Sequence, residues 1–228
     1  MKLNKAGGNM YDWITNTGNV IKGVCPHGCE YCYMKRIGGG KQKPLHFDEK
    51  ELSIKMPSGL FIFVGSSCDM WADAIPSEWI TRILVHCAAY ENKYLFQTKN
   101  PARFLQDPFS PIEVPLRLLD WVACTTIETN RMYPQMGNAP SPHARAEAMS
   151  RLAVTKYVTI EPIMDFDLGV MVELIRRCNP EQVNIGADSG RNNLPEPPYE
   201  KVLELVAELS KFTVIAKKKN LARLETSK

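Results

Sequence analysis

Six runs of apolar residues recur along the chain, and segments with helical spacing stand between them. The runs are LFIFVG from Leu60, KYLFQTK from Lys93, WVACTTIE from Trp121, KYVTIEPI from Lys156, QVNIGAD from Gln182 and FTVIAKKK from Phe212. Their starts are 33, 28, 35, 26 and 30 residues apart, which indicates a repeating strand-and-helix unit. Apolar residues occupy both alternating faces of the central runs, as expected for strands buried on both sides of a parallel sheet.

Helix signals separate these runs. Side chains that cap helix starts precede four of the segments, and a proline follows two of these caps directly. The cap candidates are Ser77, Asn100, Ser141 and Asp167. The segments SEWITRILVHCAAYEN from Ser77 and YEKVLELVAELSK from Tyr199 each place their apolar residues on one face. We therefore predict amphipathic helices between the strands.

A first strand near Asn19–Val24 brings the count to six or seven strand-and-helix units. A closed eight-stranded barrel takes about 250 residues, and this chain has 228. We predict a single α/β domain over residues 1–228, an incomplete (β/α)6 TIM-like barrel of parallel strands, with Phe212–Lys218 as a candidate seventh, edge strand. The alternative is an open doubly wound sheet, but no GxGxxG follows a strand, so nothing supports a dinucleotide site.

Composition and charge describe an ordinary globular protein. Hydrophobic residues make up 44% and charged residues 23%, and the net charge of +3 permits an anionic partner without requiring one. The seven cysteines lack the regular spacing of a secreted disulfide framework, which favours reduced thiols in the cytoplasm. The start, MKLNKAGGNMYDW, has no apolar signal region, and no run approaches the ~20 apolar residues of a membrane span.

The run VCPHGCEYCYMKR carries the most specific chemistry in the chain. Its cysteines, Cys25, Cys29 and Cys32, are spaced Cys-x-x-x-Cys-x-x-Cys. Three thiolates can ligate three irons of a 4Fe-4S cluster that normally takes four cysteines, so one iron stays without a protein ligand. Such an open iron is a place for chemistry, whereas a fully ligated cluster serves electron transfer.

Two alternatives to this interpretation stay open. The three thiolates, completed by His27 or His46, could form a structural zinc site. Zinc sites usually consist of two separated pairs of ligands, and the other four cysteines of the chain are isolated from one another. An iron–sulfur electron-transfer protein is the second alternative.

Polar groups recur where the predicted strands end. The segments are Gly65–Asp69, Thr98–Lys99, Thr125–Glu128, Thr159–Glu161 and Gly186–Asp188. Because parallel α/β folds bind ligands beyond the carboxyl ends of their strands, we expect these side chains to share a polar mouth. The alternative is that each residue merely caps the helix that follows.

The cysteine spacing, with Tyr31 before the third cysteine, resembles the signature of radical S-adenosylmethionine (SAM) enzymes. The segments GSSCD from Gly65, YLFQTKNPARFL, ACTTIETN and HARAEAMSRLAVTKYVTIEPIM resemble the branch that holds spore photoproduct lyase and phage and bacterial radical SAM proteins of unassigned function. The resemblance covers about residues 20 to 220. It implies an enzyme whose 4Fe-4S cluster reductively cleaves SAM to a 5′-deoxyadenosyl radical, which abstracts hydrogen from a substrate.

The resemblance also implies which residues bind the two cofactors. Cys25, Cys29 and Cys32 would ligate the cluster, and the backbone around Tyr31 and Tyr33 would flank the adenine of SAM. Other implied contacts are Ser66 and Ser67 for the amino group or ribose, Lys99 for the carboxylate, and Thr126 and Glu128 for the ribose hydroxyls. Arg145 is a second candidate for the carboxylate, with a surface salt bridge as the alternative, and Thr125 is expected to pack inward.

Cys68 is the candidate catalytic thiol. Spore photoproduct lyase has a hydrogen-donor cysteine at the end of its second strand, and Cys68 lies within a residue or two of that place in the resemblance. The alternative is that Cys68 is a small buried hydrophobic residue. Glu161 and Asp188 are left for substrate contact, proton transfer or structure.

The resemblance implies a flavodoxin or ferredoxin as reductant and leaves the substrate open. An incomplete barrel should have a wide side opening, which suits a nucleic acid or a partner protein. The loops Asn130–Pro142 and Ser189–Pro198 are expected at the mouth, where Arg131, Tyr133 and Arg191 could contact a nucleotide. The basic glycine-rich stretch IGGGKQK is not a P-loop, and we interpret it as a flexible connection.

Overall fold

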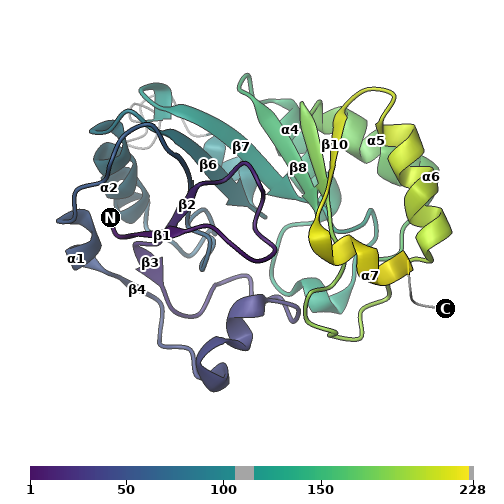
Figure 1. Cartoon of the computed structure of the whole chain (residues 1–228), viewed down its shortest axis with the longest axis horizontal. Helices are drawn as coiled ribbons and strands as arrows, with labels where there is room; N and C mark the ends of the chain where they lie inside the picture. Colours follow the sequence, from purple (N-terminus) through teal and green to yellow (C-terminus); the bar gives the residue numbers. More distant parts are fainter. Residues whose placement is uncertain (106–115, 226–228) are drawn as a thin grey trace.

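The computed structural model describes residues 1–105 and 116–225 and is built on one curved sheet (Figure 1). The strands, in spatial order, are β1 (Leu3–Lys5), β2 (Asn16–Gly18), β5 (Phe61–Val64), β6 (Lys93–Thr98), β7 (Asp120–Thr126), β8 (Lys156–Ile160), β9 (Gln182–Ile185) and β10 (Val214–Lys217). Strand β1 is antiparallel to β2, and all other neighbours in this sheet are parallel. The predicted α/β fold with an incomplete parallel barrel is confirmed, and β10 is its seventh parallel strand.

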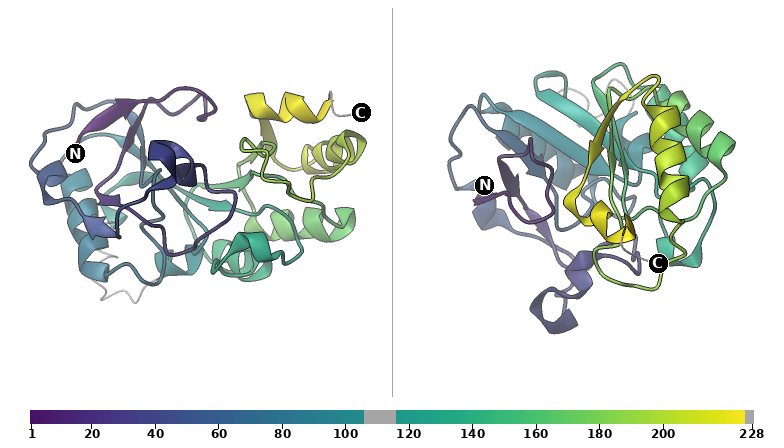
Figure 2. Two further views of the ribbon diagram at one scale, coloured as in Figure 1. Left: turned by 90° about the horizontal axis from the view of Figure 1, so that it is seen from below. Right: turned by 45° about the vertical axis from the view of Figure 1, so that its right-hand side comes forward.

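Helices cover the outer face of the sheet (Figures 1 and 2). The longer ones are α2 (Ser77–Ala88), α4 (Pro142–Ser150), α5 (Leu168–Cys178) and α6 (Tyr199–Leu209). The short elements are α1 (Glu49–Leu52), α7 (Ala222–Glu225), and the 3-10 turns η1 (Tyr33–Lys35), η2 (Ile37–Gly40), η3 (Pro101–Phe104), η4 (Pro134–Met136) and η5 (Lys219–Leu221).

The predicted first strand near Asn19–Val24 is wrong in position. The parallel strand is β2, which ends at Gly18, and the next residues leave the sheet. They form β3 (Ile21–Lys22), which pairs with β4 (His46–Phe47) in a separate antiparallel ribbon. Val20 and Ile21 are nevertheless buried in the main core. Their hydrophobicity correctly indicates burial, but it does not indicate which strand they pair with.

Two of the predicted helix starts also need correction. Ser77 lies inside α2 behind Pro76 and makes no capping hydrogen bond. Asn100 precedes only the turn η3, and the continuation of that predicted helix falls largely within residues 106–115, outside the described residues. Ser141 is confirmed as a cap, because its hydroxyl accepts a hydrogen bond from the Ala144 amide at 3.1 Å.

The sheet is buried on both faces. One set of strand residues packs under the helices, and the alternating set lines the inside of the barrel. That inner set is covered by the N-terminal loop, which inserts Tyr11 and Ile14 among Phe63, Leu95 and Val122. The N-terminal loop therefore forms the floor of the open barrel.

The two edges of the barrel are bridged by polar side chains instead of strand pairing. The Asn220 amide donates to Asn9 Oδ1 at 3.3 Å, and Lys219 pairs with Asp12 at 3.3 Å. Lys218 Nζ lies 4.4 Å from the centre of the Tyr11 ring. The barrel is not closed by strand pairing, but these contacts bridge its edges at this place, so an opening here gives no argument for a macromolecular substrate. Among the described residues, no helix is long and apolar enough to cross a bilayer.

Candidate active site

The cysteine motif lies on a long excursion between β3 and β4. The two limbs of the excursion meet at their base, where the Val24 amide donates to the Lys43 carbonyl at 3.0 Å. Gly23 has a positive φ of 98°, and a Cβ there would lie 2.3 Å from the Pro44 carbonyl oxygen, so only glycine fits this crossing. Lys22 fixes the base further through an ion pair with Glu51 at 2.7 Å.

The loop after β7 holds the cysteine motif from one side. The Asn138 amide donates to the His27 carbonyl at 2.7 Å, and the Glu30 amide donates to the Gln135 carbonyl at 2.9 Å. Gly137 has a φ of 63°, and a Cβ there would lie 2.2 Å from the His27 carbonyl oxygen. This part of the loop, which we expected at the substrate, instead supports the cysteines.

The three cysteines line one cavity of about 500 Å³ beyond the carboxyl ends of the strands. Cys68 lines the same cavity, and the interaction of its thiol with Cys25 lowers the pKa of Cys25 and raises that of Cys68. Burial raises the pKa of Cys29, whose thiol donates to the Met136 carbonyl at 3.3 Å.

The donor set fits an iron–sulfur cluster better than a single ion. In residues 1–105 and 116–225, no group of three or more His, Cys, Asp or Glu side chains is arranged around one metal position. A cubane cluster does not need that arrangement, because each thiolate ligates a different iron. Three free thiols of one loop facing a shared cavity match this requirement.

A side-chain hydrogen bond ties the cysteine motif to the strand ends. His27 Nε2 lies 2.9 Å from Asp69 Oδ2, which also accepts from the Thr98 hydroxyl at 2.9 Å and the Lys99 amide at 2.8 Å. Burial opposes ionisation of Asp69, but these hydrogen bonds hold its pKa below the usual range. His27, a zinc-ligand candidate in the sequence, is therefore engaged with Asp69. Sequence reasoning missed this pair, although Asp69 directly follows Cys68.

Glu128 is the centre of a buried charge cluster. Its carboxylate has no exposed surface and accepts from Arg145 at 2.7 Å and from Lys99 and Tyr31. Burial alone would raise the pKa of Glu128, but the charges of Arg145 and Lys99 lower it strongly. Arg145 is also fully buried, so the alternative of a surface salt bridge is wrong.

This cluster presents positive charge to the cavity through one residue. Two cations, Lys99 and Arg145, face the single carboxylate of Glu128, which leaves a surplus of one positive charge. Arg145 Nη2 is buried and has no hydrogen-bond partner among the described residues. Lys99, whose side chain is 16% exposed, lines the cavity together with Tyr31, whereas Glu128 and Arg145 do not. An anionic group of a ligand would therefore be attracted to Lys99.

The other predicted cofactor residues also lie at the cavity. Its wall includes Ser66, Ser67, Thr126 and Tyr33, whereas Thr125 is buried and donates to the Thr98 carbonyl, as expected for inward packing. Asn19 organises the serines, since its Oδ1 accepts from the Ser67 amide at 2.8 Å and its Nδ2 donates to Ser66 Oγ at 3.1 Å. Sequence reasoning missed Asn19 because we had assigned it to a strand.

The far half of the cavity is polar and surrounds Glu161. This carboxylate accepts from Asn9 and Asn220 at 2.7 Å each and from Lys218 at 2.5 Å. Tyr11 lies beside it and donates to Gln97 Oε1 at 2.8 Å. Of these six residues only Glu161 was singled out in the sequence, because four of the others come from near the two ends of the described chain and Gln97 from β6.

Two other expected residues are engaged in contacts that shape the loops. Asp188 lines the cavity but accepts from the Gly190 amide at 2.9 Å and from Asn192 Nδ2 at 2.7 Å, which shapes the following turn. Arg131 pairs with Asp165 at 2.5 Å and Asp167 at 2.6 Å. Its guanidinium therefore joins the loop after β7 to the loop after β8.

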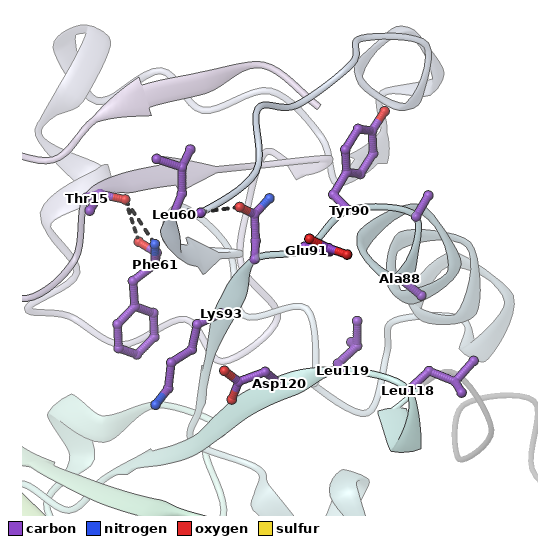
Figure 3. A pocket seen from close by; sticks show the side chains of 13 residues that line it. Thr15, Leu60, Phe61, Ala88, Tyr90, Glu91, Lys93, Leu118, Leu119 and Asp120 are labelled. Atoms are coloured by element: carbon purple, nitrogen blue, oxygen red, sulfur yellow. Dashed lines mark hydrogen bonds between the residues drawn. The ribbon is translucent and has the colours of Figure 1, made fainter.

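A second hollow, of about 860 Å³, lies at the amino-terminal ends of the strands (Figure 3). Asn92 beside it is occupied by structural bonds to the Leu60 amide and the Pro57 carbonyl, both at 2.9 Å. Lys93 Nζ lies 5.3 Å from the centre of the Phe61 ring. None of the predicted site residues lies there, so the cavity at the carboxyl ends is the candidate active site.

Comparisons with known proteins show the fold. No protein-family model and no curated protein matches the chain. Among solved structures, the chain is similar to a cysteine-to-serine variant of spore photoproduct lyase, with a TM-score of 0.60 and 12% identity. The match covers 94% of this chain and 78% of that one. At this identity the likeness shows a shared architecture over almost the whole chain.

Proposed function

We propose that this protein is a radical SAM enzyme that binds a 4Fe-4S cluster through Cys25, Cys29 and Cys32. The observation that carries the proposal is the position of these thiols. They face the same cavity as the polar strand ends of an incomplete parallel barrel, the fold shared with spore photoproduct lyase. When bound, the cluster would supply an electron to SAM, and the resulting 5′-deoxyadenosyl radical would abstract hydrogen from a substrate.

In this proposal Lys99 binds the carboxylate of SAM. The surplus positive charge of the buried cluster supports this role, since Lys99 alone of the three charged residues lines the cavity. Glu128 was expected at the ribose, but it is completely buried and does not line the cavity. We assign Glu128 and Arg145 to positioning Lys99 and Tyr31, and leave the ribose to Thr126, which lines the cavity.

The far half of the cavity is assigned to the substrate. Its wall carries Tyr11, Gln97, Glu161 and Lys218. Because Glu161 accepts three hydrogen bonds, it is held as a fixed carboxylate beside Lys218. A reacting group with both hydrogen-bond donors and acceptors is complementary to this pair.

The test is anaerobic reconstitution with iron and sulfide, followed by EPR of the reduced protein with and without SAM. We expect a 4Fe-4S signal that SAM shifts, and release of 5′-deoxyadenosine. Cys29→Ala should lose the cluster, whereas Cys87→Ala, a buried cysteine in α2, should keep it. Bound zinc in a colourless protein would indicate a zinc-stabilised binding module, and a cluster that ignores SAM would indicate an electron-transfer protein.

A further inference from the structure

A positively charged arm projects from the molecule directly after the cysteine motif. We call residues 33–43, YMKRIGGGKQK, the basic arm. It contains the turns η1 and η2 and extends away from the sheet and its helices (Figures 1 and 2). Four of its residues are basic and none is acidic: Lys35, Arg36, Lys41 and Lys43. The stretch IGGGKQK, which we expected to be a flexible connection, therefore forms part of the protein surface beside the candidate cluster site.

The four basic residues divide into two pairs. Lys35 and Arg36 lie at the cavity and donate to the carbonyls of Gly28 at 3.0 Å and Ser189 at 3.3 Å. Lys41 and Lys43 are exposed, do not line the cavity, and form no ion pair with any described residue. Their charges are therefore available to a partner.

Apolar side chains are exposed on the same excursion. Ile37 is 55% exposed, Val24 47% and Tyr33 45%. Large exposed apolar residues within a basic surface are typical of a protein interface, in which apolar contacts add to electrostatic attraction. A purely phosphate-binding surface would not need Ile37 and Val24.

We propose that the basic arm, with Val24, Tyr33 and Ile37, is the docking surface for an acidic protein that donates single electrons. This inference rests on the proposed function, because that function needs an external electron donor. One electron would leave the reduced cofactor of the donor and enter the cluster, so the donor is oxidised by one electron and no atom is transferred. Cys25 and Cys32, both partly exposed, adjoin the arm and give the donor a short approach.

Such a complex should form quickly and depend on salt. Lysines at the rim of an interface steer an oppositely charged partner and mainly affect the association rate. Interfaces of electron-transfer proteins are small and short-lived. Unpaired surface charges such as those of Lys41 and Lys43 contribute less as ionic strength rises.

The test uses charge reversal in the arm and a matched control. The test variant is Lys41→Glu with Lys43→Glu, and the control is Lys55→Glu with Arg151→Glu. Both control residues are exposed, and neither belongs to the arm or lines the cavity. The two variants change the net charge equally. The first readout is the Kd of each cluster-free protein for an oxidised acidic flavodoxin, measured by calorimetry at low and moderate salt.

We expect the arm variant to bind flavodoxin at least about tenfold more weakly at low salt, with the control within about twofold of wild type. An unchanged Kd for the arm variant would overturn the proposal, as would an equal loss in the control. A short single-stranded DNA that binds the wild type, and loses affinity in the arm variant while flavodoxin does not, would assign the arm to nucleic acid instead.

The second readout separates this inference from the proposed function. SAM cleavage by the reconstituted protein is driven either by flavodoxin or by dithionite, a small reductant that needs no docking surface. We expect the arm variant to be slow with flavodoxin and normal with dithionite. No cleavage of SAM by wild type with either reductant would refute the proposed function, while the Kd values would still decide whether the arm binds an acidic protein.

Discussion

The Glu128 carboxylate is completely buried and accepts hydrogen bonds from Lys99, Arg145 and the Tyr31 hydroxyl. A buried carboxylate between two cations stabilises a fold only while every partner is present, because removing one charge leaves the others buried and uncompensated. Arg145 has no exposed surface, so water could not solvate its guanidinium in place of the carboxylate. The residue that we expected at the ribose is thus a structural support for the residues that line the cavity.

Glu128→Gln should therefore destabilise the protein strongly. The substitution keeps the shape but leaves Lys99 and Arg145 without their carboxylate, and such a loss costs about 3–5 kcal/mol of unfolding free energy. Urea unfolding measures it. The control is Glu49→Gln, whose exposed carboxylate pairs with Arg82, and which should leave the urea midpoint nearly unchanged. Equal effects of both substitutions would contradict this account.

The stability difference between wild type and Glu128→Gln should depend on pH. The pKa of Glu128 is lowered in the folded state, so its contribution is complete above the unfolded pKa and is lost as the pH falls toward the folded value. We expect the difference to be constant near pH 7 and to shrink as the pH falls below about 4.3, the ordinary pKa of glutamate. Urea unfolding at several pH values measures this, and a difference that grows in acid would refute it.

At the scale of elements, the excursion between β3 and β4 depends on the loop after β7 for its shape. The two segments are about a hundred residues apart in the chain, and backbone hydrogen bonds join them. Gly137 lies at the closest approach, with a positive φ that favours glycine. The cysteine motif is therefore held by an element with no cysteine of its own.

Gly137→Ala should impair cluster assembly. A methyl group at this position would lie 2.2 Å from the His27 carbonyl oxygen, so the cysteine motif must shift. We expect less iron per protein after reconstitution. Gly169→Ala is the control, because no atom of the described part of the chain lies within 4 Å of a Cβ there. It should load iron normally and gain about 0.5–1 kcal/mol from helix propensity. Normal iron content in Gly137→Ala would argue against this role of the loop.

The starts of helices α4 and α2 allow a second test at the scale of elements. Ser141 caps α4, the helix that carries Arg145, whereas Ser77 makes no capping hydrogen bond. Ser141→Ala should cost about 1 kcal/mol of unfolding free energy, and Ser77→Ala should cost clearly less. Thermal or urea unfolding of the two variants measures the difference. A larger loss of stability in Ser77→Ala than in Ser141→Ala would show that the capping hydrogen bond of Ser141 is not the stabilising contact.

At the scale of the whole molecule, segments near both ends of the described chain complete the open barrel. Residues from the N-terminal loop fill its floor, and Asn9 and Asn220 meet above Glu161. The wall of the far half of the cavity therefore depends on contacts between residues about two hundred positions apart.

Asn220→Ala should loosen this wall. The substitution removes hydrogen bonds from Asn220 Nδ2 to Glu161 Oε1 at 2.7 Å and to Ser189 Oγ at 2.8 Å. We expect faster amide hydrogen exchange in residues 7–13, with little change in the buried strands β6 and β7. Unchanged exchange in residues 7–13 would show that the side chain of Asn220 does not hold this loop.

The amino-acid pattern by itself determined the parallel strand-and-helix repeat, the cysteine motif and the polar strand ends. These signals are local, because the pattern of a strand buried on both faces and the spacing of the cysteine ligands each depend on neighbouring residues in the sequence. Lys99, Ser66, Ser67 and Thr126 could be placed at the cavity for the same reason, since each directly follows or ends a strand.

Only the tertiary structure decided which of these side chains face the cavity and which support it. Glu128 and Thr126 belong to one strand-end segment, yet Thr126 lines the cavity and Glu128 is buried against Arg145. The first strand was misplaced because hydrophobicity indicates burial and does not select a partner strand. Pairs such as His27 with Asp69, or Asn9 with Asn220, join distant segments, and such contacts arise from the path of the folded chain.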